Sequence, residues 1–246
     1  YLSATDLLRP MRMIKSQHDI DKMKEAGRIT EAAFADTLTN LKLGMTELEI
    51  VQEVNYQLRK HGSLGQSFTT SLYNSGPNHP LLFGQRMETW KRKLDPPVSI
   101  LFDFGGIYNG WCYDYGRTVF FGEPTEEAIT VYDLIMASQA AGVAALKSGQ
   151  ATTSEVDAAA RKVIEDGGYG EEFRHRLGHS IGMDVHEPPF LTKGDETPLE
   201  EGMLFTIEPS ITQFNTFSAR VEDIVVARPD GGEKLTNGWQ ELIVIS

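Results

Sequence analysis

Residues 98–121 read VSILFDFGGIYNGWCYDYGRTVFF and contain two apolar runs that each carry a carboxylate. Residues 98–104 and 111–121 are rich in β-branched and aromatic side chains, which is typical of strands. Asn109 and Gly110 lie between the runs and form a strong hairpin signal. The sequence therefore predicts two paired strands, with Asp103 in the first and Asp114 in the second.

A carboxylate inside an apolar strand needs a partner, because burying it alone costs several kcal/mol. Glu208 and Glu222 lie in similar apolar runs further along the chain. A single acid of this kind is usually a cap, a surface residue or half of an ion pair. Four together exceed what the two nearby arginines, at positions 117 and 220, can neutralise. Bound divalent cations would satisfy them, since such ions favour hard oxygen ligands.

Three of the six histidines fall within residues 175–187, which read HRLGHSIGMDVHE. Imidazole adds affinity for a metal and selects a transition metal over magnesium or calcium. His175, His179 and His186 are therefore candidate metal-site residues. The alternative is that they are solvated loop histidines.

Helix signals occur in two pairs along the chain, and each pair is followed by strands. Possible capping boxes at residues 16, 46 and 152 and an apolar pattern after residue 126 predict helices over about residues 16–38, 46–61, 126–147 and 155–165. Strands are expected at residues 68–73, 203–208, 219–227 and 241–245. This order predicts a single α+β domain with a pseudo-repeat over residues 16–246. Residues 1–15 lack a clear period and are expected to be a connecting segment.

Composition limits the classes of partner. The chain has 246 residues with 35 acidic and 23 basic side chains, a formal net charge of -12, which would repel nucleic acid and anionic lipid. The apolar stretch near residues 135–146 is short of the roughly 20 residues that cross a bilayer, so no membrane partner is expected. The single cysteine, Cys112, suits a reducing compartment, and a cytoplasmic location is expected.

The motifs together resemble those of the creatinase, prolidase and aminopeptidase P family of pita-bread metallopeptidases, which also includes methionine aminopeptidase. They stand in the order of the family and comprise DFG at 103–105, DYGRT at 114–118, the histidine segment at 175–187, TIEP at 206–209 and RVED at 220–223. The resemblance extends from about residue 11 to residue 246. It implies a pita-bread fold, in which a curved antiparallel sheet is flanked by helices and two halves are related by a pseudo-twofold axis.

The resemblance also implies a site for two divalent metal ions. Its five ligands would be Asp103, Asp114, His179, Glu208 and Glu222. Among these, Asp114 and Glu222 would bridge the metals, and a water between the metals would attack the scissile carbonyl. Manganese is the leading expectation, and cobalt, iron or zinc also suit these ligands.

Three further roles follow from the same resemblance. Glu208 would take the proton of the attacking water, while His175 and His186 would line the substrate side and stabilise developing charge. Arg220 would lie beside the bridging glutamate and orient the ligands. A simple surface ion pair is the alternative for Arg220.

Several positions depart from the family pattern. Ungapped matching places Phe83 where peptidase relatives have a histidine that contacts substrate, and His79 is a candidate to replace it. Thr212 stands where relatives usually have tyrosine, and Ser210 replaces a glycine. Gly116 stands where the family often has threonine. His79, Phe83 and Thr212 are therefore the expected substrate-binding positions.

The function implied by the resemblance is hydrolysis of the N-terminal peptide bond of Xaa-Pro peptides by a homodimer. Two alternatives stay open. The same fold and metals could act on a non-peptide small molecule, as a hydrolase of another C–N bond or as a lyase, which Phe83 and Thr212 would favour. The chain could also be a peptidase-like binding module without catalysis. The segment before residue 16 resembles the joint at which such enzymes leave a smaller N-terminal domain.

Overall fold

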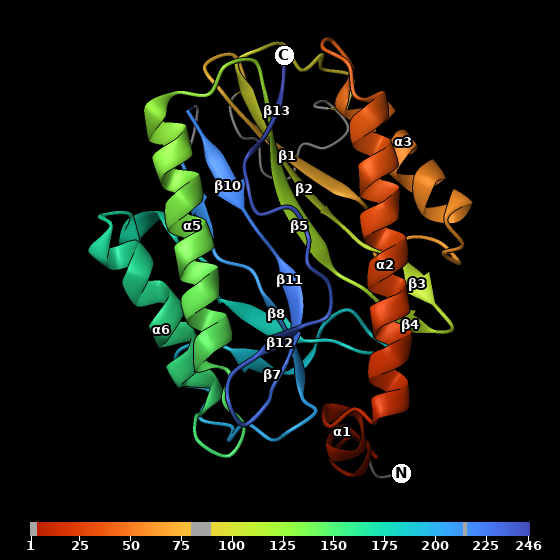
Figure 1. The fold of residues 1–246 in the computed structure, drawn as a ribbon, viewed down its shortest axis with the longest axis vertical. Helices are drawn as coiled ribbons and strands as arrows, with labels where there is room; N and C mark the ends of the chain where they lie inside the picture. Colours follow the sequence, from red (N-terminus) through yellow and green to blue (C-terminus); the bar gives the residue numbers. More distant parts are fainter. Residues whose placement is uncertain (1–3, 80–89, 214–215) are drawn as a thin grey trace.

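A computed structural model describes residues 4–79, 90–213 and 216–246 of the chain. Two pairs of long helices flank a central layer of strands, one pair on each side (Figure 1). The first pair is α2 (Gln17–Asn40) and α3 (Glu47–Lys60), and the second is α5 (Glu126–Ala145) and α6 (Thr153–Asp166). The predicted α+β organisation with a repeated helix pair is therefore confirmed.

The helices begin where the sequence signals place them. Ser16, Thr46 and Thr152 each accept a hydrogen bond from a backbone N–H in the first turn, and an acidic side chain three residues later completes a capping box. These boxes satisfy backbone donors that have no partner within the helix. Thr125 caps α5 in the same way, although without the reciprocal bond.

Two main sheets lie between the helix pairs. The first has the order β1-β2-β5-β13 and the second has the order β12-β11-β8-β6-β7. The first sheet consists of β1 (Ser71–Ser75), β2 (Val98–Phe104), β5 (Tyr115–Phe121) and β13 (Ile243–Ile245). The second consists of β6 (Gly178–Ser180), β7 (Glu187–Leu191), β8 (Leu204–Ile207), β11 (Asp223–Val226) and β12 (Glu233–Lys234). Two short pairs complete the layer: β3 (Ile107–Tyr108) with β4 (Trp111–Cys112), and β9 (Ser210–Thr212) with β10 (Ser218–Arg220).

The predicted strand over residues 111–121 is interrupted at Asp114. The predicted turn at Asn109 and Gly110, with φ of 49° and 84°, joins β3 to β4. After the break, β5 pairs with β2 instead, with Asp103 opposite Gly116. The chain thus changes its pairing partner at Asp114, and this carboxylate lies outside both ladders.

A matching interruption occurs at Glu222, within the predicted strand over residues 219–227. The strand before it, β10, pairs with β9, and the strand after it, β11, pairs with β8. Glu222 itself forms an isolated bridge to Gly116, which links the two halves of the layer. Both carboxylates expected to bridge metals therefore lie where the chain passes from one set of partners to another.

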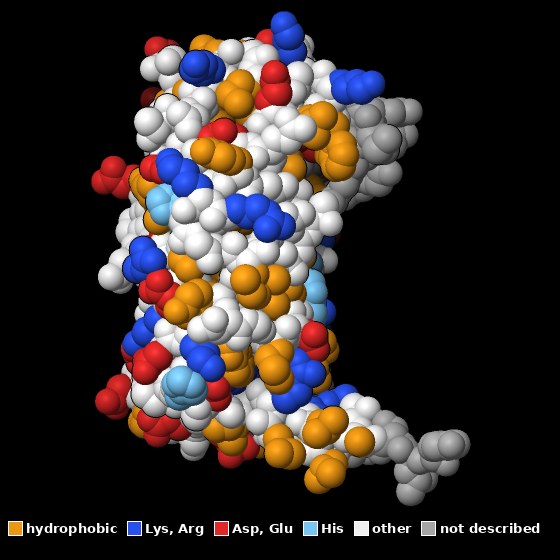
Figure 2. Space-filling view, turned by 90° about the vertical axis from the view of Figure 1, so that its right-hand side faces the viewer, with side chains coloured by type: hydrophobic (Ala, Val, Ile, Leu, Met, Phe, Trp, Pro, Cys, Tyr) orange, Lys and Arg blue, Asp and Glu red, His pale blue; other side chains and the backbone are white. Residues whose placement is uncertain are grey.

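The segment before residue 16 differs from the prediction, because it contains a helix, α1 (Thr5–Met13). Its apolar side chains include Leu7 and Met11, which are 70% and 72% exposed. These side chains therefore contribute little to the core. Figure 1 places this helix at the lower end of the molecule, and Figure 2 shows hydrophobic side chains exposed at that end.

Helix α5 also corrects an expectation from the sequence. Its 20 residues are long and apolar enough to cross a membrane, whereas the sequence estimate placed the apolar stretch well below that length. In the structure its inner face packs into the core, with Val131 and Ile135 fully buried and Gly142 facing Ile207 and Ala160. Core packing accounts for the apolar composition of this face, and the absence of a membrane partner stays a prediction.

Candidate metal centre

An acidic cavity of about 380 Å³ lies between the two halves of the strand layer. It is lined by Phe68, Thr69, Ser71, Tyr73, Asp103, Asp114, His179, Val185, His186, Glu208, Arg220 and Glu222. All five ligands implied by the resemblance are among these residues. Two of them come from the first half, Asp103 from β2 and Asp114 from the residue before β5, and the other three come from the second half.

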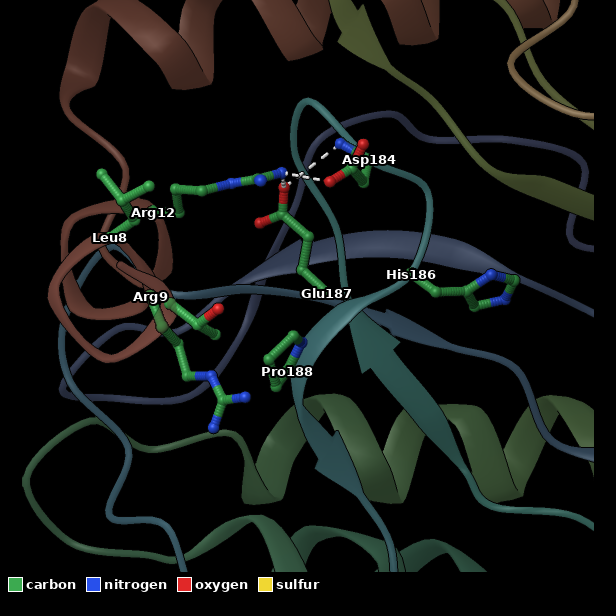
Figure 3. Close-up of a pocket in the computed structure, with 8 residues that line it drawn as sticks. Leu8, Arg9, Arg12, Asp184, His186, Glu187 and Pro188 are labelled. Carbon is green, nitrogen blue, oxygen red and sulfur yellow. Dashed lines mark hydrogen bonds and ion pairs between the residues drawn. The ribbon is translucent and has the colours of Figure 1, made fainter. Parts of the chain in front are cut away.

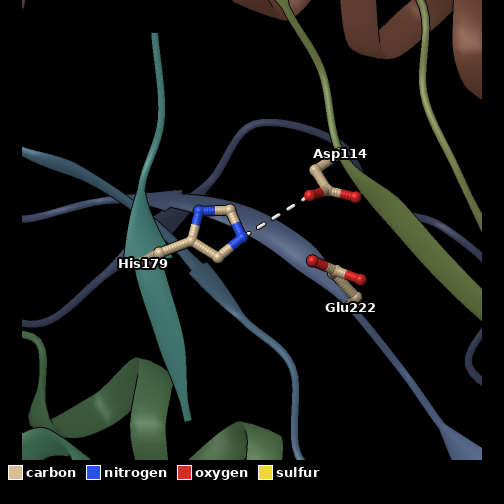
Figure 4. Close-up of side chains that lie close together, drawn as sticks. All are labelled: Asp114, His179 and Glu222. Atoms are coloured by element: carbon tan, nitrogen blue, oxygen red, sulfur yellow. Dashed lines mark ion pairs between the residues drawn. The ribbon is translucent and has the colours of Figure 1, made fainter. Parts of the chain in front are cut away.

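The side chains of Asp114, His179 and Glu222 point toward one another (Figure 4). Each offers a ligand atom, and these atoms all lie within 4.8 Å of one another. The Nε2 atom of His179 is 3.5 Å from Asp114 Oδ2 and also 3.5 Å from Glu208 Oε1. Four predicted ligands are thus brought into one cluster by strands far apart in the sequence.

Asp103 joins the cluster through Arg220. One guanidinium nitrogen of Arg220 lies 3.1 Å from Asp103 Oδ2 and 3.6 Å from Glu208 Oε2. The arginine therefore holds two of the predicted ligands, which matches the orienting role expected of it and differs from a surface ion pair. Arg117, the other arginine near these acids, instead pairs with the buried Asp223 at 2.6 Å.

Burial and mutual repulsion raise the pKa of two carboxylates well above the ordinary range. For Asp114 the main cause is burial, followed by the charge of Glu208. The pKa of Glu222 is raised first by burial and then by the charge of Asp114. A cluster of this kind is costly unless positive charge enters it.

Each of these two acids has an oxygen without a hydrogen-bond partner in the described ranges, Asp114 Oδ1 and Glu222 Oε2. A bridging carboxylate uses both of its oxygens. The two free oxygens, together with three other oxygen or imidazole ligands in reach, are the donor set that divalent transition metals take. The residues present therefore fit the metal pair that the resemblance implies.

The orientation of His179 also suits a metal. Its Nδ1 lies 3.1 Å from the backbone oxygen of Ser180 and can donate a proton there, which leaves Nε2 facing the carboxylates as an acceptor. Burial lowers the pKa of His179, so the neutral, metal-binding form is favoured. A backbone acceptor that fixes the tautomer is a common feature of metal-ligating histidines.

His175 is fixed by contacts at both ring nitrogens. Its Nδ1 is 2.7 Å from the backbone oxygen of Arg176, and its Nε2 contacts the hydroxyl of Ser210. Burial lowers the pKa of His175 to about 3. The neutral ring therefore accepts from Ser210, the residue that replaces the family glycine.

His186 lies at the rim of the cavity. Its ring centroid is 4.2 Å from that of His179, and the side chain remains exposed. It is therefore available to a ligand that approaches the acidic cluster.

The expected substrate-binding positions lie elsewhere or outside the description. His79 is buried. Its Nε2 accepts a hydrogen bond from the backbone N–H of Asp95 at 3.3 Å and lies 3.1 Å from the backbone oxygen of Lys93. Thr212 pairs with Ser218 in the β9–β10 ladder. Neither lines the acidic cavity as the described residues form it. Phe83 falls outside the described residues.

Gly116, the remaining departure, faces a predicted ligand directly. A Cβ at this position would lie 2.9 Å from Glu222 Cβ and 3.0 Å from Glu222 Oε2. The missing side chain thus leaves room for the carboxylate of Glu222 in its present position.

An ionic cluster behind His186, not predicted from the sequence, connects α1 to the site (Figure 3). Glu187 is 5% exposed and accepts from Arg12 at 2.5 Å and from Lys15 at 3.3 Å. Arg12 also contacts Asp184 at 2.6 Å, and Lys15 contacts Ser180, which follows the predicted ligand His179. No sequence signal marked this cluster, because its members lie more than 160 residues apart.

The model of metallopeptidase family M24 matches residues 21–229. The Xaa-Pro dipeptidase of Lactobacillus delbrueckii subsp. lactis is 37% identical over 243 residues, which cover 98% of this chain and 64% of that protein. The chain thus spans slightly less than two thirds of the length of this relative.

Solved structures give the same result. The X-Pro aminopeptidase from Thermotoga maritima MSB8 superposes with a TM-score of 0.91 at 35% identity, over 98% of this chain and 67% of that one. The prolidase from Pyrococcus furiosus superposes with a TM-score of 0.88 at 31% identity, over 95% and 68%. The predicted pita-bread fold is confirmed. With a family match over most of its length and a cluster of acids and histidine that fits two cations, the chain belongs to metallopeptidase family M24.

Proposed function

We propose that this chain is the catalytic domain of a metal-dependent peptidase that hydrolyses the N-terminal bond of Xaa-Pro peptides. The observation that carries the proposal is the convergence of five metal-ligating side chains on one cavity, with unpartnered oxygens on Asp114 and Glu222. The Xaa-Pro dipeptidases and the X-Pro aminopeptidase to which the chain is similar support this substrate class.

In this proposal Asp103, Asp114, His179, Glu208 and Glu222 would hold two divalent cations. When bound, the cations would polarise the scissile carbonyl and lower the pKa of a water toward neutral. Arg220 keeps Asp103 and Glu208 in place through its contacts at 3.1 Å and 3.6 Å. Manganese is the leading metal, with cobalt, iron or zinc as substitutes on the same ligands.

The remaining catalytic and substrate-binding roles would belong to Glu208, His186 and His175. Glu208, 8% exposed at the edge of the cavity, accepts the proton of the attacking water and passes it to the leaving nitrogen. His186, exposed at the rim, donates to the oxygen on which negative charge develops. His175, held by Ser210 and the backbone, lines the substrate side next to Arg220.

The proposal includes three features of the whole protein. We expect a homodimer with a short peptide as substrate, a smaller N-terminal domain joined through residues 1–15, and a cytoplasmic location. The location is supported by the buried free thiol of Cys112, which suits a reducing compartment.

The experiment is hydrolysis of a panel of Xaa-Pro dipeptides after the metal-free protein is reconstituted with manganese, cobalt, iron or zinc. Release of proline in proportion to bound metal is the expected result. A protein that binds two metal equivalents and cleaves none of these peptides would instead favour the non-peptide alternative. A protein that binds no divalent metal would favour the non-catalytic binding module.

A further inference from the structure

His175 is carried by a segment that has no regular structure of its own. Residues 173–177 lie outside the helices and strands of the described chain, and β6 begins after them. Backbone N–H and C=O groups in such a segment need partners from elsewhere in the fold. The ring of His175 lines a cavity of about 470 Å³ that shares Glu208 and Arg220 with the acidic cavity. The contacts that fix this segment therefore also fix the histidine beside the site.

Arg161, on α6, supplies two of these partners. One terminal nitrogen, Nη1, donates to the backbone oxygen of Phe173 at 2.9 Å, and the other, Nη2, donates to the backbone oxygen of His175 at 2.8 Å. The guanidinium carbon also lies 4.1 Å from the centroid of the Phe173 ring, which is a cation–π contact. That ring contacts the ring of His175 edge-on, with 5.2 Å between the centroids. Arg161 thus contacts the backbone of the histidine directly and its ring through Phe173.

Asp157, also on α6, holds Arg161 in this position. Its two carboxylate oxygens accept from Nε and Nη2 of the guanidinium, both at 3.0 Å, which is the two-point geometry that arginine and carboxylate favour. One of these oxygens, Oδ1, also accepts from the backbone N–H of Leu177 at 3.0 Å. The two side chains of α6 therefore form one unit with three backbone atoms of the segment, in residues 173, 175 and 177.

An ion pair four residues apart on a helix usually stabilises only the helix itself. Lys162 and Asp166 form such a pair on α6, at 2.8 Å, with side chains that are 71% and 64% exposed. Asp157 and Arg161 have the same spacing, but their side chains are 2% and 25% exposed. Their remaining hydrogen bonds go to the segment that carries His175. This difference indicates a role beyond the helix.

We propose that Asp157 and Arg161 are positioning residues for the peptidase reaction and hold His175 toward the substrate through residues 173–177. This inference rests on the proposed peptidase function, in which His175 lines the substrate side and stabilises developing charge. A displacement of about 1 Å can cost such a group a factor of about 100 in rate. Because a group that acts in the transition state contributes to kcat, removing its support should lower kcat and leave KM nearly unchanged.

The predicted metal ligands next to this segment have other supports. The backbone oxygen of Leu177 accepts from the N–H of Glu208 at 2.9 Å. The N–H of His179 donates to the hydroxyl of Thr206 at 3.1 Å. Neither bond involves Arg161, so a change at Arg161 should leave the metal content that of wild type.

The experiment measures kcat and KM of the metal-loaded protein for an Xaa-Pro dipeptide. Arg161→Met removes both backbone contacts, and we expect kcat to fall about 10- to 100-fold with KM within about 2-fold of wild type. Arg161→Lys keeps a positive charge beside the buried Asp157, so it provides the test if Arg161→Met does not fold. Its ammonium cannot replace the planar fork, and we expect an intermediate loss of kcat. Lys162→Met removes an exposed charge from the next position of α6 and should leave both constants unchanged.

Two further measurements separate positioning from general destabilisation. His175→Gln removes the imidazole, so in that background Arg161→Lys should change kcat by no more than about 2-fold. The Cε1 resonances of the histidines, recorded by NMR on the zinc-loaded protein, give a readout that does not depend on turnover. In Arg161→Lys the resonance of His175, assigned from its absence in His175→Gln, should shift. The resonance of His61, at the end of α3, should not.

The outcomes are distinguishable. An unchanged kcat or an unchanged His175 resonance in Arg161→Lys would overturn the positioning role, while hydrolysis by wild type upheld the proposed function. Equal losses of kcat from Arg161→Lys with and without the imidazole of His175, or a loss confined to KM, would likewise overturn it. Failure of the metal-loaded wild type on every Xaa-Pro peptide would reject the proposed function, and with it this inference.

Discussion

Asp114 and Glu222 carry a high electrostatic cost, because both are buried beside other acids and each has an oxygen without a partner among the described residues. The sequence predicted that these acids need a cation, since the apolar residues around them indicate burial. It did not predict the contacts that fix the other groups, such as the hydroxyl of Ser210 at His175. Such contacts depend on strand packing, which a single sequence does not encode locally.

Asp114→Asn tests the electrostatic argument directly. The variant should lose at least one metal equivalent, measured by elemental analysis, because a bridging oxygen anion is removed. Its metal-free form should be more stable than metal-free wild type by about 1–3 kcal/mol in urea unfolding, because a buried unpaired charge is gone. The control Asp133→Asn makes the same change at an exposed position of α5 and should have neither effect. Full metal content in Asp114→Asn would contradict the assignment of Asp114 as a metal ligand.

Cys112 should react slowly in the native protein. Burial raises the pKa of its thiol to about 11, and the thiol donates to the backbone oxygen of Met183. The folded state thus retains this proton more firmly than the unfolded chain, and the related stability is lost as pH rises toward 11. Alkylation by iodoacetamide, followed by mass spectrometry, should accelerate about tenfold per pH unit from pH 7 to 10, because only the thiolate reacts. A plateau near pH 9, as expected for denatured protein, would be evidence against the raised pKa.

At the scale of elements, local signals predicted the helices and missed the interruptions in two strands. The capping boxes at Ser16, Thr46 and Thr152 are short-range hydrogen-bond patterns, and all three form as predicted. The breaks at Asp114 and Glu222 arise because the chain changes its pairing partner, which alternation and composition do not reveal. Helix α1 was not predicted; its Leu7, Leu8 and Met11 are exposed, whereas Met13 packs against the core.

The ionic contact between α1 and β7 should stabilise the loop that carries His186. Glu187→Gln would remove the carboxylate that pairs with Lys15, which is 4% exposed, and should lower the free energy of unfolding by about 3 kcal/mol. Because Glu187 follows His186, kcat for an Xaa-Pro dipeptide should fall while the metal content remains that of wild type.

A double-mutant cycle in urea provides the control for this contact. Lys15→Met combined with Glu187→Gln should be more stable than Glu187→Gln alone, because the uncompensated buried charge has been removed. Strictly additive effects of the two substitutions would show that Lys15 and Glu187 do not stabilise each other.

At the scale of the whole molecule, the site draws on both halves of the strand layer. Asp103 and Asp114 come from the first half, and His179, Glu208 and Glu222 come from the second. The pseudo-repeat and the approximate place of each half followed from the order of helix pairs and strands. The way in which the two halves meet could not be predicted from the sequence, because it depends on long-range contacts such as the bridge between Gly116 and Glu222.

Metal should therefore stabilise the molecule in a pH-dependent way. The raised pKa values of Asp114 and Glu222 mean that the metal-free fold binds protons there more tightly than the unfolded chain. This stability is present at low pH and is lost as pH rises above the unfolded values. The difference in Tm between manganese-loaded and metal-free protein should thus increase from pH 5 to pH 8, measured by calorimetry. Ionisable groups that do not contact the metal affect the Tm of both forms equally and do not contribute to the difference. A Tm difference that stays constant from pH 5 to pH 8 would contradict the prediction.

The last strand of the fold has a consequence for the order of assembly during synthesis. β13 joins the edge of the first sheet and pairs in parallel with β5, more than 100 residues earlier in the chain. As the chain emerges from the ribosome, residues 119–121 are made long before residues 243–245. Until then the backbone groups on that edge of β5 have no strand to pair with. A nascent chain interrupted before Ile243 would keep that apolar edge open, which is the kind of surface that chaperones protect and that aggregates recruit.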